Sequence, residues 1–248
     1  MSDYKLNISG KWELTDWKHC DAHNNLTPNE FYALRDSGQL AECCKQELIA
    51  WDNMILDAWI TSIIKNMLGT NTAPDNLALD YIVVGTGYTT VASTDTQLNL
   101  EFYRAAPTYT AQNGKSVISE LYINPATANP PTTLIVSSGA QNSITVTGAT
   151  GANFAVNNRL RIVTSNGFEF RTITNIATDT FTLDSDLLGT PTVSGGVVKC
   201  YAEYAIVGGD ATGSANTGKF VNRSLSSYAK TTASGATIRV TISFLSKT

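Results

Sequence analysis

The chain has 248 residues with 21 acidic and 17 basic side chains, a net charge of −4 and a charged fraction of 15%, against roughly 25% in average soluble proteins. General binding to nucleic acid needs clustered Lys and Arg, so the acidic balance without such a cluster argues against it. No apolar run approaches the roughly 20 residues of a membrane span, and the opening MSDYKLNISG lacks the apolar core of a signal peptide. We therefore expect a protein that is made in a cytoplasm and contacts no membrane.

The first forty residues predict one strand and one capped helix. Residues Lys5 to Trp17 alternate loosely between apolar and polar, as in an edge or lead-in strand, with Gly10 as a break or bulge. Thr27 can cap a helix, Pro28 fits the first helical position, and Glu30 stands where a capping box places its carboxylate.

The next segment predicts the longest helix of the chain. Apolar or thiol side chains keep three-and-four spacing from Leu40 to Leu68, which is the pattern of an amphipathic helix. Asp52 or Asn53 can restart a helix inside this run. The best helix should therefore span about residues 53 to 68 and bury Trp59.

From Leu77 onward the pattern is almost wholly β, with turn residues at the roughly 8–12-residue spacing of sandwiches and small barrels. Tyr81 to Val84 form a β-favouring run, and Gly85 and Gly87 can adopt positive φ without a Cβ clash. Asp95 can bond its own backbone in the turn that follows.

A second β unit begins after a change in amino-acid composition. The stretch from Asn124 to Thr133 contains Pro130-Pro131, which forces an extended linker. Six short strands are predicted between Leu134 and about Val198: LIVSS, SITVTG, RLRIVTS, FEFRTITNI, TFTLDS and GGVVKCY. Asn166-Gly167 is a type I′ hairpin signal, and Ala177-Thr178-Asp179 predicts a second tight turn.

The stretch LALDYIVVGTGYTTVASTDTQLNLEFYR, residues 77–104, resembles a segment common in structural proteins of tailed bacteriophages. In that family a helix opened by Asn precedes a strand ending in GTG, and a TDT-type loop leads to a Glu and an Arg. The residues that carry the resemblance are Asn53, Gly69, Gly85, Thr86, Gly87, Thr94, Asp95, Thr96, Leu98, Glu101 and Arg104. After Cys200 the family pattern continues with Glu203, Arg223, Lys230, Thr231 and the alternating strand from Ile238 to Phe244. The family's E-x-G-x-F motif is replaced by EYAIV in this chain.

The predicted fold is mainly β: a β-sandwich with an N-terminal α-helical segment and an inserted small β-barrel or sandwich. The split sandwich domain comprises residues 1–124 and 199–248, and the inserted domain comprises residues 125–198. Insertions of this kind succeed at exposed loop tips, where the ends of the parent loop already lie close together. Strands from both parts of the split domain should therefore pair in a single sheet.

Motifs that could hold a metal or a phosphate are incomplete. The stretch from His19 to His23 offers zinc ligands, but only Cys43 and Cys44 could complete the site. Gly85-Thr86-Gly87 lacks the third glycine and the following helix of a phosphate-binding loop. We expect no metal and no cofactor.

Charged pairs offer two further interpretations. Asp179, Asp184 and Asp186 could bind a weak calcium ion or act as a glycosidase pair, although turn formation explains them more simply. Glu101 and Arg104 are three residues apart, a spacing that brings side chains together in a helix. We interpret them as a structural ion pair or an interface contact.

The resemblance implies a non-enzymatic building block of a tailed-phage particle, located in the tail, baseplate, collar or fibre attachment rather than in capsid decoration. Its partners would be other virion proteins and further copies of itself in a ring or trimer, assembled in the host cytoplasm. An alternative is a module that recognises host glycans through Phe168, Phe170 and Phe181. A third is a polysaccharide-degrading enzyme that uses Asp184 and Asp186.

Overall fold

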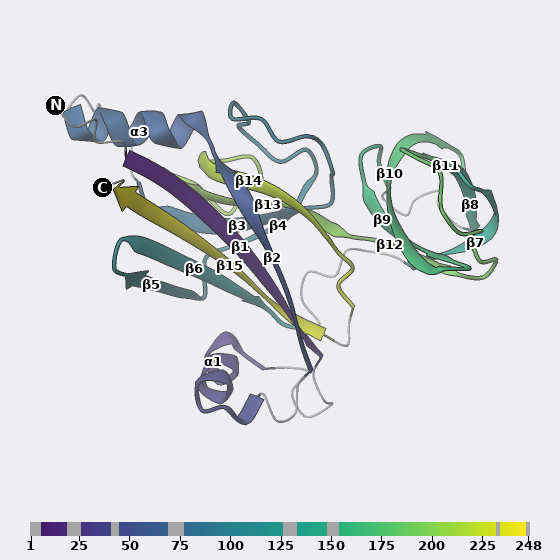
Figure 1. Ribbon diagram of the computed structural model, residues 1–248, viewed down its shortest axis with the longest axis horizontal. Helices are drawn as coiled ribbons and strands as arrows, with labels where there is room; N and C mark the ends of the chain where they lie inside the picture. Colours follow the sequence, from purple (N-terminus) through teal and green to yellow (C-terminus); the bar gives the residue numbers. More distant parts are fainter. Residues whose placement is uncertain are drawn as a thin grey trace.

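The computed structural model describes residues 6–18, 26–40, 45–68, 77–125, 133–147, 154–231 and 234–246. The protein is mainly β, with a nine-stranded sheet and a closed six-stranded barrel beside it (Figure 1). The sheet contains β1 (Leu6–Lys18), β2 (Lys45–Ile55), β3 (Leu79–Gly85), β4 (Glu101–Ala105), β5 (Tyr109–Asn113), β6 (Ser116–Ile123), β13 (Tyr201–Gly208), β14 (Lys219–Tyr228) and β15 (Ser234–Ser246). The barrel contains β7 (Thr133–Ala140), β8 (Ser143–Thr147), β9 (Arg159–Thr164), β10 (Gly167–Ala177), β11 (Thr180–Leu183) and β12 (Gly196–Lys199).

The sheet takes strands from both sides of the barrel in the sequence. Its order is β4-β3-β13-β14-β2-β1-β15-β6-β5, and every pair that is described is antiparallel. β13 pairs with β3, and β15 lies between β1 and β6. The expected pairing of strands that precede the double proline with strands that follow Cys200 is therefore present.

One apolar core joins the two halves of this sheet. Buried side chains from β1, β15 and β6 form a single cluster with others from β3, β13 and β14, and two of its large, fully buried members are Trp12 and Tyr204. The rings of these two residues lie 6.1 Å apart. Because β3 also contacts β6, the sheet curves around this core.

β1 corrects the expectation for the start of the chain. It lies between β2 and β15 in the middle of the sheet, so it is neither an edge nor a lead-in strand. Gly10 pairs in unbroken register with Asn53 on one side and Ile242 on the other, so the predicted break is absent. Local alternation cannot distinguish a central strand from an edge, since distant segments supply the partners.

The capped helix α1 (Pro28–Asp36) is confirmed. Thr27 Oγ1 accepts from the Glu30 backbone N–H at 3.4 Å, and Glu30 Oε2 accepts from the Thr27 N–H at 2.8 Å. Phe31 is buried and stacks on Tyr122 of β6 with ring centroids 3.9 Å apart. Tyr32 adds a second ring contact, with Tyr109 of β5 at 5.8 Å, so α1 packs on the sheet through two aromatic side chains.

The expected helical run from Leu40 is wrong over its first half, where the chain forms β2. The second helix, α3 (Asp57–Leu68), begins only at Asp57. Ile49, Trp51 and Ile55 instead follow the two-residue period of a strand and pack against the main core. Nine consecutive pairings with β1 outweigh the local helical pattern. Within α3, Trp59 is buried as expected.

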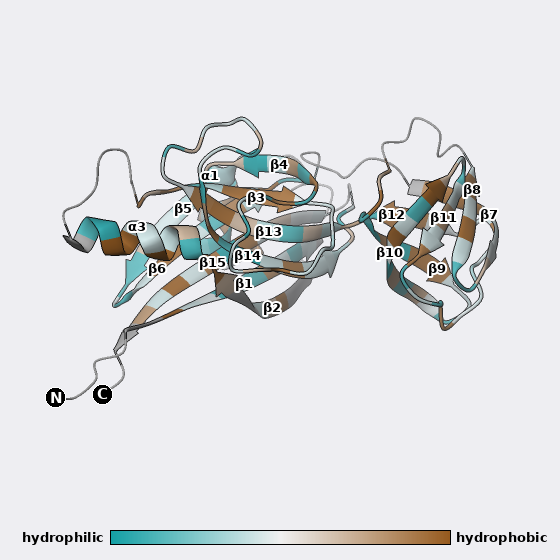
Figure 2. Ribbon diagram, turned by 90° about the horizontal axis from the view of Figure 1, so that it is seen from above, coloured by the Kyte–Doolittle hydropathy of each residue, from teal (hydrophilic) through white to brown (hydrophobic). Residues whose placement is uncertain are grey.

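The barrel contains all six strands that the sequence predicts. Its core is apolar and includes Ile144, Leu160, Ile162, Phe181 and Val197, each 0% exposed. Figure 2 shows hydrophobic and hydrophilic residues in alternation along the barrel strands, as period-two patterning requires.

Two hairpins of the barrel lie where the sequence predicts them. β9 and β10 are joined at Ser165-Asn166, one residue earlier than expected, and only Gly167 has positive φ, at 107°. The turn is therefore not of type I′, which needs two such residues. Between β10 and β11 the predicted turn is present, and Thr178 adopts a φ of 54°.

Candidate functional site

The motif residues Glu203, Arg223 and Asp95 meet in one buried ionic network. Glu203 on β13 is 0% exposed and Arg223 on β14 is 3% exposed. Arg223 Nη2 donates to Glu203 Oε1, and Arg223 Nη1 donates to Asp95 Oδ2 at 2.6 Å. One guanidinium therefore bridges two carboxylates from distant parts of the chain.

This network fixes the loop between β3 and β4, residues 86–100. Arg223 Nη2 donates to Thr89 Oγ1 at 2.7 Å, and Asp95 Oδ2 accepts from the Ala92 N–H at 2.9 Å. Glu203 Oε2 accepts from the Leu100 N–H at 3.1 Å. Charge-assisted bonds therefore attach the loop at both ends and in its middle.

Gly85 and Gly87 allow this loop to approach Glu203. A Cβ at Gly85 would lie 2.7 Å from Glu203 Oε2 and 2.9 Å from the Leu100 carbonyl oxygen, and one at Gly87 would lie 3.0 Å from Asn99 Oδ1. Neither glycine has positive φ, which corrects the expectation. These two positions require glycine because other atoms approach their backbone too closely to leave room for a Cβ.

Glu101 and Arg104 form the predicted ion pair, but in the strand β4 and not in a helix. Arg104 Nε lies 2.7 Å from Glu101 Oε1, and both side chains are almost fully buried. The register shifts so that Gly85 faces Glu101 while Val84 faces Tyr103, which leaves one extra residue in β4. Such a bulge reverses the alternation and brings residues three apart onto one face.

The same ion pair holds the loop between β13 and β14. Arg104 Nη1 donates to the Thr212 carbonyl oxygen at 2.9 Å and to Thr217 Oγ1 at 3.0 Å. Glu101 Oε2 accepts from the Asn216 N–H at 3.2 Å. The Glu101 and Arg104 side chains therefore bind a neighbouring loop of the same chain.

The two remaining motif residues lie outside this network. Asn53 pairs with Gly10 inside β2 and does not open a helix. Lys230 follows β14, and its Nζ donates to the Pro125 carbonyl oxygen at 2.8 Å. Burial lowers the pKa of Lys230 to about 8, although the Asp16 carboxylate acts in the opposite direction. Lys230 thus connects β14 to the segment that leaves the sheet after β6.

The Gly-Thr-Gly turn also contacts the barrel. The Thr86 carbonyl oxygen accepts from the Arg159 N–H at 2.9 Å, and the Tyr88 N–H donates to the Asn157 carbonyl oxygen at 2.9 Å. Asn158 Nδ2 donates to Thr86 Oγ1 at 3.0 Å. Asn157 adopts a φ of 74°, which Asn tolerates better than most residues, but no pattern in the sequence indicates its contact with residues 86–88.

The aromatic residues considered for glycan binding separate into two groups. Phe181 is 0% exposed in the barrel core, so it cannot contact a glycan. Phe168 is 58% exposed. Phe168 and Phe170 line a crevice of about 370 Å³ together with Arg161 of the barrel and Asp16 of the sheet.

The predicted metal and carboxylate alternatives gain no support. No group of three or more His, Cys, Asp or Glu side chains that could hold a metal occurs among the described residues, and the stretches 19–23 and 41–44 lie outside them. Asp184 Oδ1 accepts from the Thr172 N–H at 3.1 Å and Asp184 Oδ2 lies 3.4 Å from Arg159 Nη1, which gives this carboxylate a place in the barrel framework.

None of the described helices is long and apolar enough to cross a membrane. No protein-family model matches the sequence, and comparisons of the sequence and of the structure with known proteins find no significant match.

Proposed function

We propose that this protein is a non-enzymatic structural component of a tailed-phage particle, built as a β-sandwich with N-terminal helices and an inserted small barrel. It would act in the tail, baseplate, collar or fibre attachment through self-association and contacts with other virion proteins. The proposal starts from the resemblance of residues 77–104 and of the C-terminal strands to that family.

The observation that carries the proposal is the use of the motif residues inside the protein. Glu203 and Arg223 neutralise each other below the surface, and each also makes a hydrogen bond to the loop of residues 86–100. Buried and mutually paired charges serve fixed geometry better than proton transfer to a substrate. Motif residues that fix the conformation of a loop suit a virion protein, because every copy in the particle must present the same surface.

The edge of the sheet supports a role in self-association. β5 is an edge strand with the sequence YTAQN, which contains neither a charge nor a proline. Charged residues and prolines in an edge strand usually prevent it from pairing with a strand of another chain. We expect copies related by symmetry to use such neutral surfaces in a ring or trimer.

The proposal can be tested on particles of the phage that encodes the chain. Mass spectrometry of purified particles should detect the protein in a fixed ratio to the other virion proteins. Deletion of its gene should give particles that lack a defined substructure in electron micrographs. Absence of the protein from purified particles would contradict the proposal.

A second candidate function is recognition of host glycans at the crevice that Phe168 and Phe170 line. An exposed aromatic ring beside the polar side chains of Asp16 and Arg161 is suited to stacking on a sugar and bonding its hydroxyls. A glycan array probed with the full chain should give discrete signals that Phe168→Ala removes. Val193→Ala, at another exposed apolar residue of the barrel region, should leave them unchanged, and a blank array would remove this candidate.

A further inference from the structure

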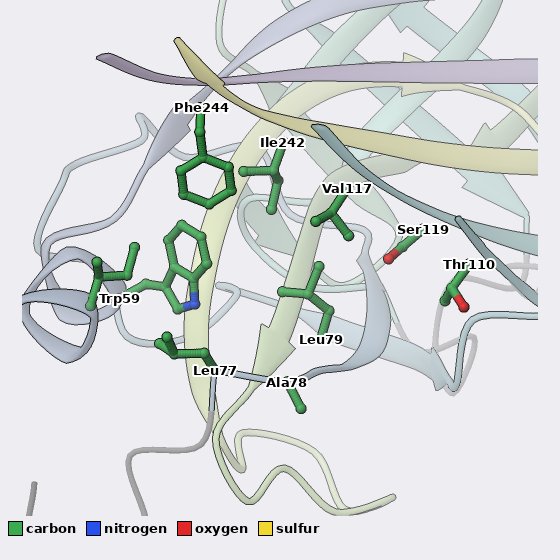
Figure 3. Close-up of a pocket in the computed structure, with 10 residues that line it drawn as sticks. Trp59, Leu77, Ala78, Leu79, Thr110, Val117, Ser119, Ile242 and Phe244 are labelled. Atoms are coloured by element: carbon green, nitrogen blue, oxygen red, sulfur yellow. The ribbon is translucent and has the colours of Figure 1, made fainter. Parts of the chain in front are cut away.

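An apolar cavity of about 440 Å³ lies between α3, the start of β3 and the strands β5, β6 and β15 (Figure 3). Trp59 lies at one end of the view, Ser119 and Thr110 lie at the other, and Leu79 and Val117 lie between them. The lining contains no charged side chain. Its volume and apolar character fall in the range of small-molecule sites, roughly 300–1,000 Å³.

Two buried polar atoms border this cavity without a partner. Trp59 Nε1 and Ser119 Oγ make no hydrogen bond to any described residue, and the two residues are 6% and 1% exposed. A buried polar group left unpaired costs about 1–3 kcal/mol. The indoles of Trp12 and Trp51 also lack partners within the described residues, but neither residue lines the cavity.

We propose that this cavity binds a neutral molecule with an apolar chain or ring and one hydrogen-bond acceptor, such as an aliphatic alcohol, ester or amide. The acceptor would receive the Trp59 N–H, and the apolar body would lie against Leu79, Val117 and Ile242. A carboxylate or ammonium group would be desolvated without a charged partner, so ionised ligands of equal length are disfavoured. This site goes beyond the proposed function in assembly and does not depend on it.

The experiment is calorimetric titration of the full chain with octan-1-ol, octanoate and octylammonium, which share one chain length. Octan-1-ol should bind, and both ions should bind at least tenfold more weakly. Trp59→Phe should weaken octan-1-ol binding by about 2–10-fold, the range expected for one neutral hydrogen bond. Trp51→Phe, the same change outside the cavity, should leave the affinity unchanged.

A second variant tests the location without altering the core. Val117 lines the cavity between Leu79 and Ile242 and is 36% exposed (Figure 3), so Val117→Trp should obstruct the cavity and abolish binding in a protein whose circular dichroism is unchanged. The control variant Val193→Trp, changed in the barrel region, should bind octan-1-ol as the parent protein does. The proposal is overturned if octan-1-ol gives no heat up to its solubility limit, if the Val117→Trp variant binds as the parent does, or if octanoate binds equally well.

Discussion

The sheet and the barrel bury different kinds of side chain. The sheet encloses charged residues, with Glu203, Arg223 and Glu120 all at most 3% exposed. The barrel core is apolar, and its ion pair between Arg171 and Glu169 retains partial exposure. One barrel residue, Lys199 at the end of β12, is charged and 4% exposed, and its ammonium group lies over the Phe154 ring. The sheet thus adds buried charged groups to its apolar core, whereas the barrel core consists of apolar side chains.

The sharpest test of this comparison is the removal of one charge from each region. Arg223→Met would leave the fully buried Glu203 carboxylate without its partner, so the free energy of unfolding should fall by about 3–5 kcal/mol. Arg171→Met in the barrel should cost less, about 1–2 kcal/mol, because Glu169 keeps hydrogen bonds from the Leu188 and Gly189 N–H groups. Urea denaturation of both variants measures the difference, and equal losses would remove the distinction.

A cavity in the barrel core tests whether the barrel is stabilised on its own. Leu160→Ala removes a fully buried side chain and should cost about 3 kcal/mol. Hydrogen exchange read by mass spectrometry should then show reduced protection in β7–β12, while β1 and β15 keep theirs. Equal loss of protection in both regions would mean that they unfold as one unit.

Substitution of Gly85 tests the close approach of the loop to Glu203. Gly85→Ala would place a methyl group against the Leu100 carbonyl oxygen and Glu203 Oε2, which should cost about 1–3 kcal/mol. Gly213→Ala is the matched control, because no atom lies within 4 Å of a Cβ built there. Thermal unfolding should distinguish the two variants, and similar melting temperatures would contradict the packing argument.

Substitution of Lys230 should have the smallest effect on the free energy of unfolding, and this effect should depend on pH. Burial lowers its pKa from 10.5 to about 8 in the folded chain, so between these values the unfolded chain binds more protons. The free energy of unfolding should therefore rise with pH across this window, by on the order of 1 kcal/mol more than in Lys230→Met. Urea denaturation at pH 8 and pH 10 measures this. Parallel pH profiles for the two proteins would exclude the shift.

The contrast also explains what the sequence could predict. Three hairpins join barrel strands that are consecutive in the chain, β7–β8, β9–β10 and β10–β11, and alternation with turn residues located all six barrel strands. β2 is held by its pairing with β1, which is distant in the sequence: Gly10 pairs with Asn53 and Lys18 pairs with Lys45. The local pattern of β2 predicted a helix instead. In the first part of the chain, the sequence predicted the strand β1, the capped helix α1 and the second half of the later helix, but not the strand β2 or the central place of β1 in the sheet.

The candidate site was predictable as a set of residues but not as an arrangement. The resemblance selected Gly85, Asp95, Glu203 and Arg223, yet it gave no reason for them to meet. The bulge in β4 that joins Glu101 to Arg104 arises from a register shift against β3. Such a shift depends on how two strands pair, which residue spacing within one strand does not encode.

Sedimentation velocity of the purified chain over a wide concentration range tests the central claim most directly. The account predicts a closed assembly of defined stoichiometry, a trimer or a ring, that dissociates only on dilution. A single species at the monomer mass of 26.6 kDa at every concentration would contradict it.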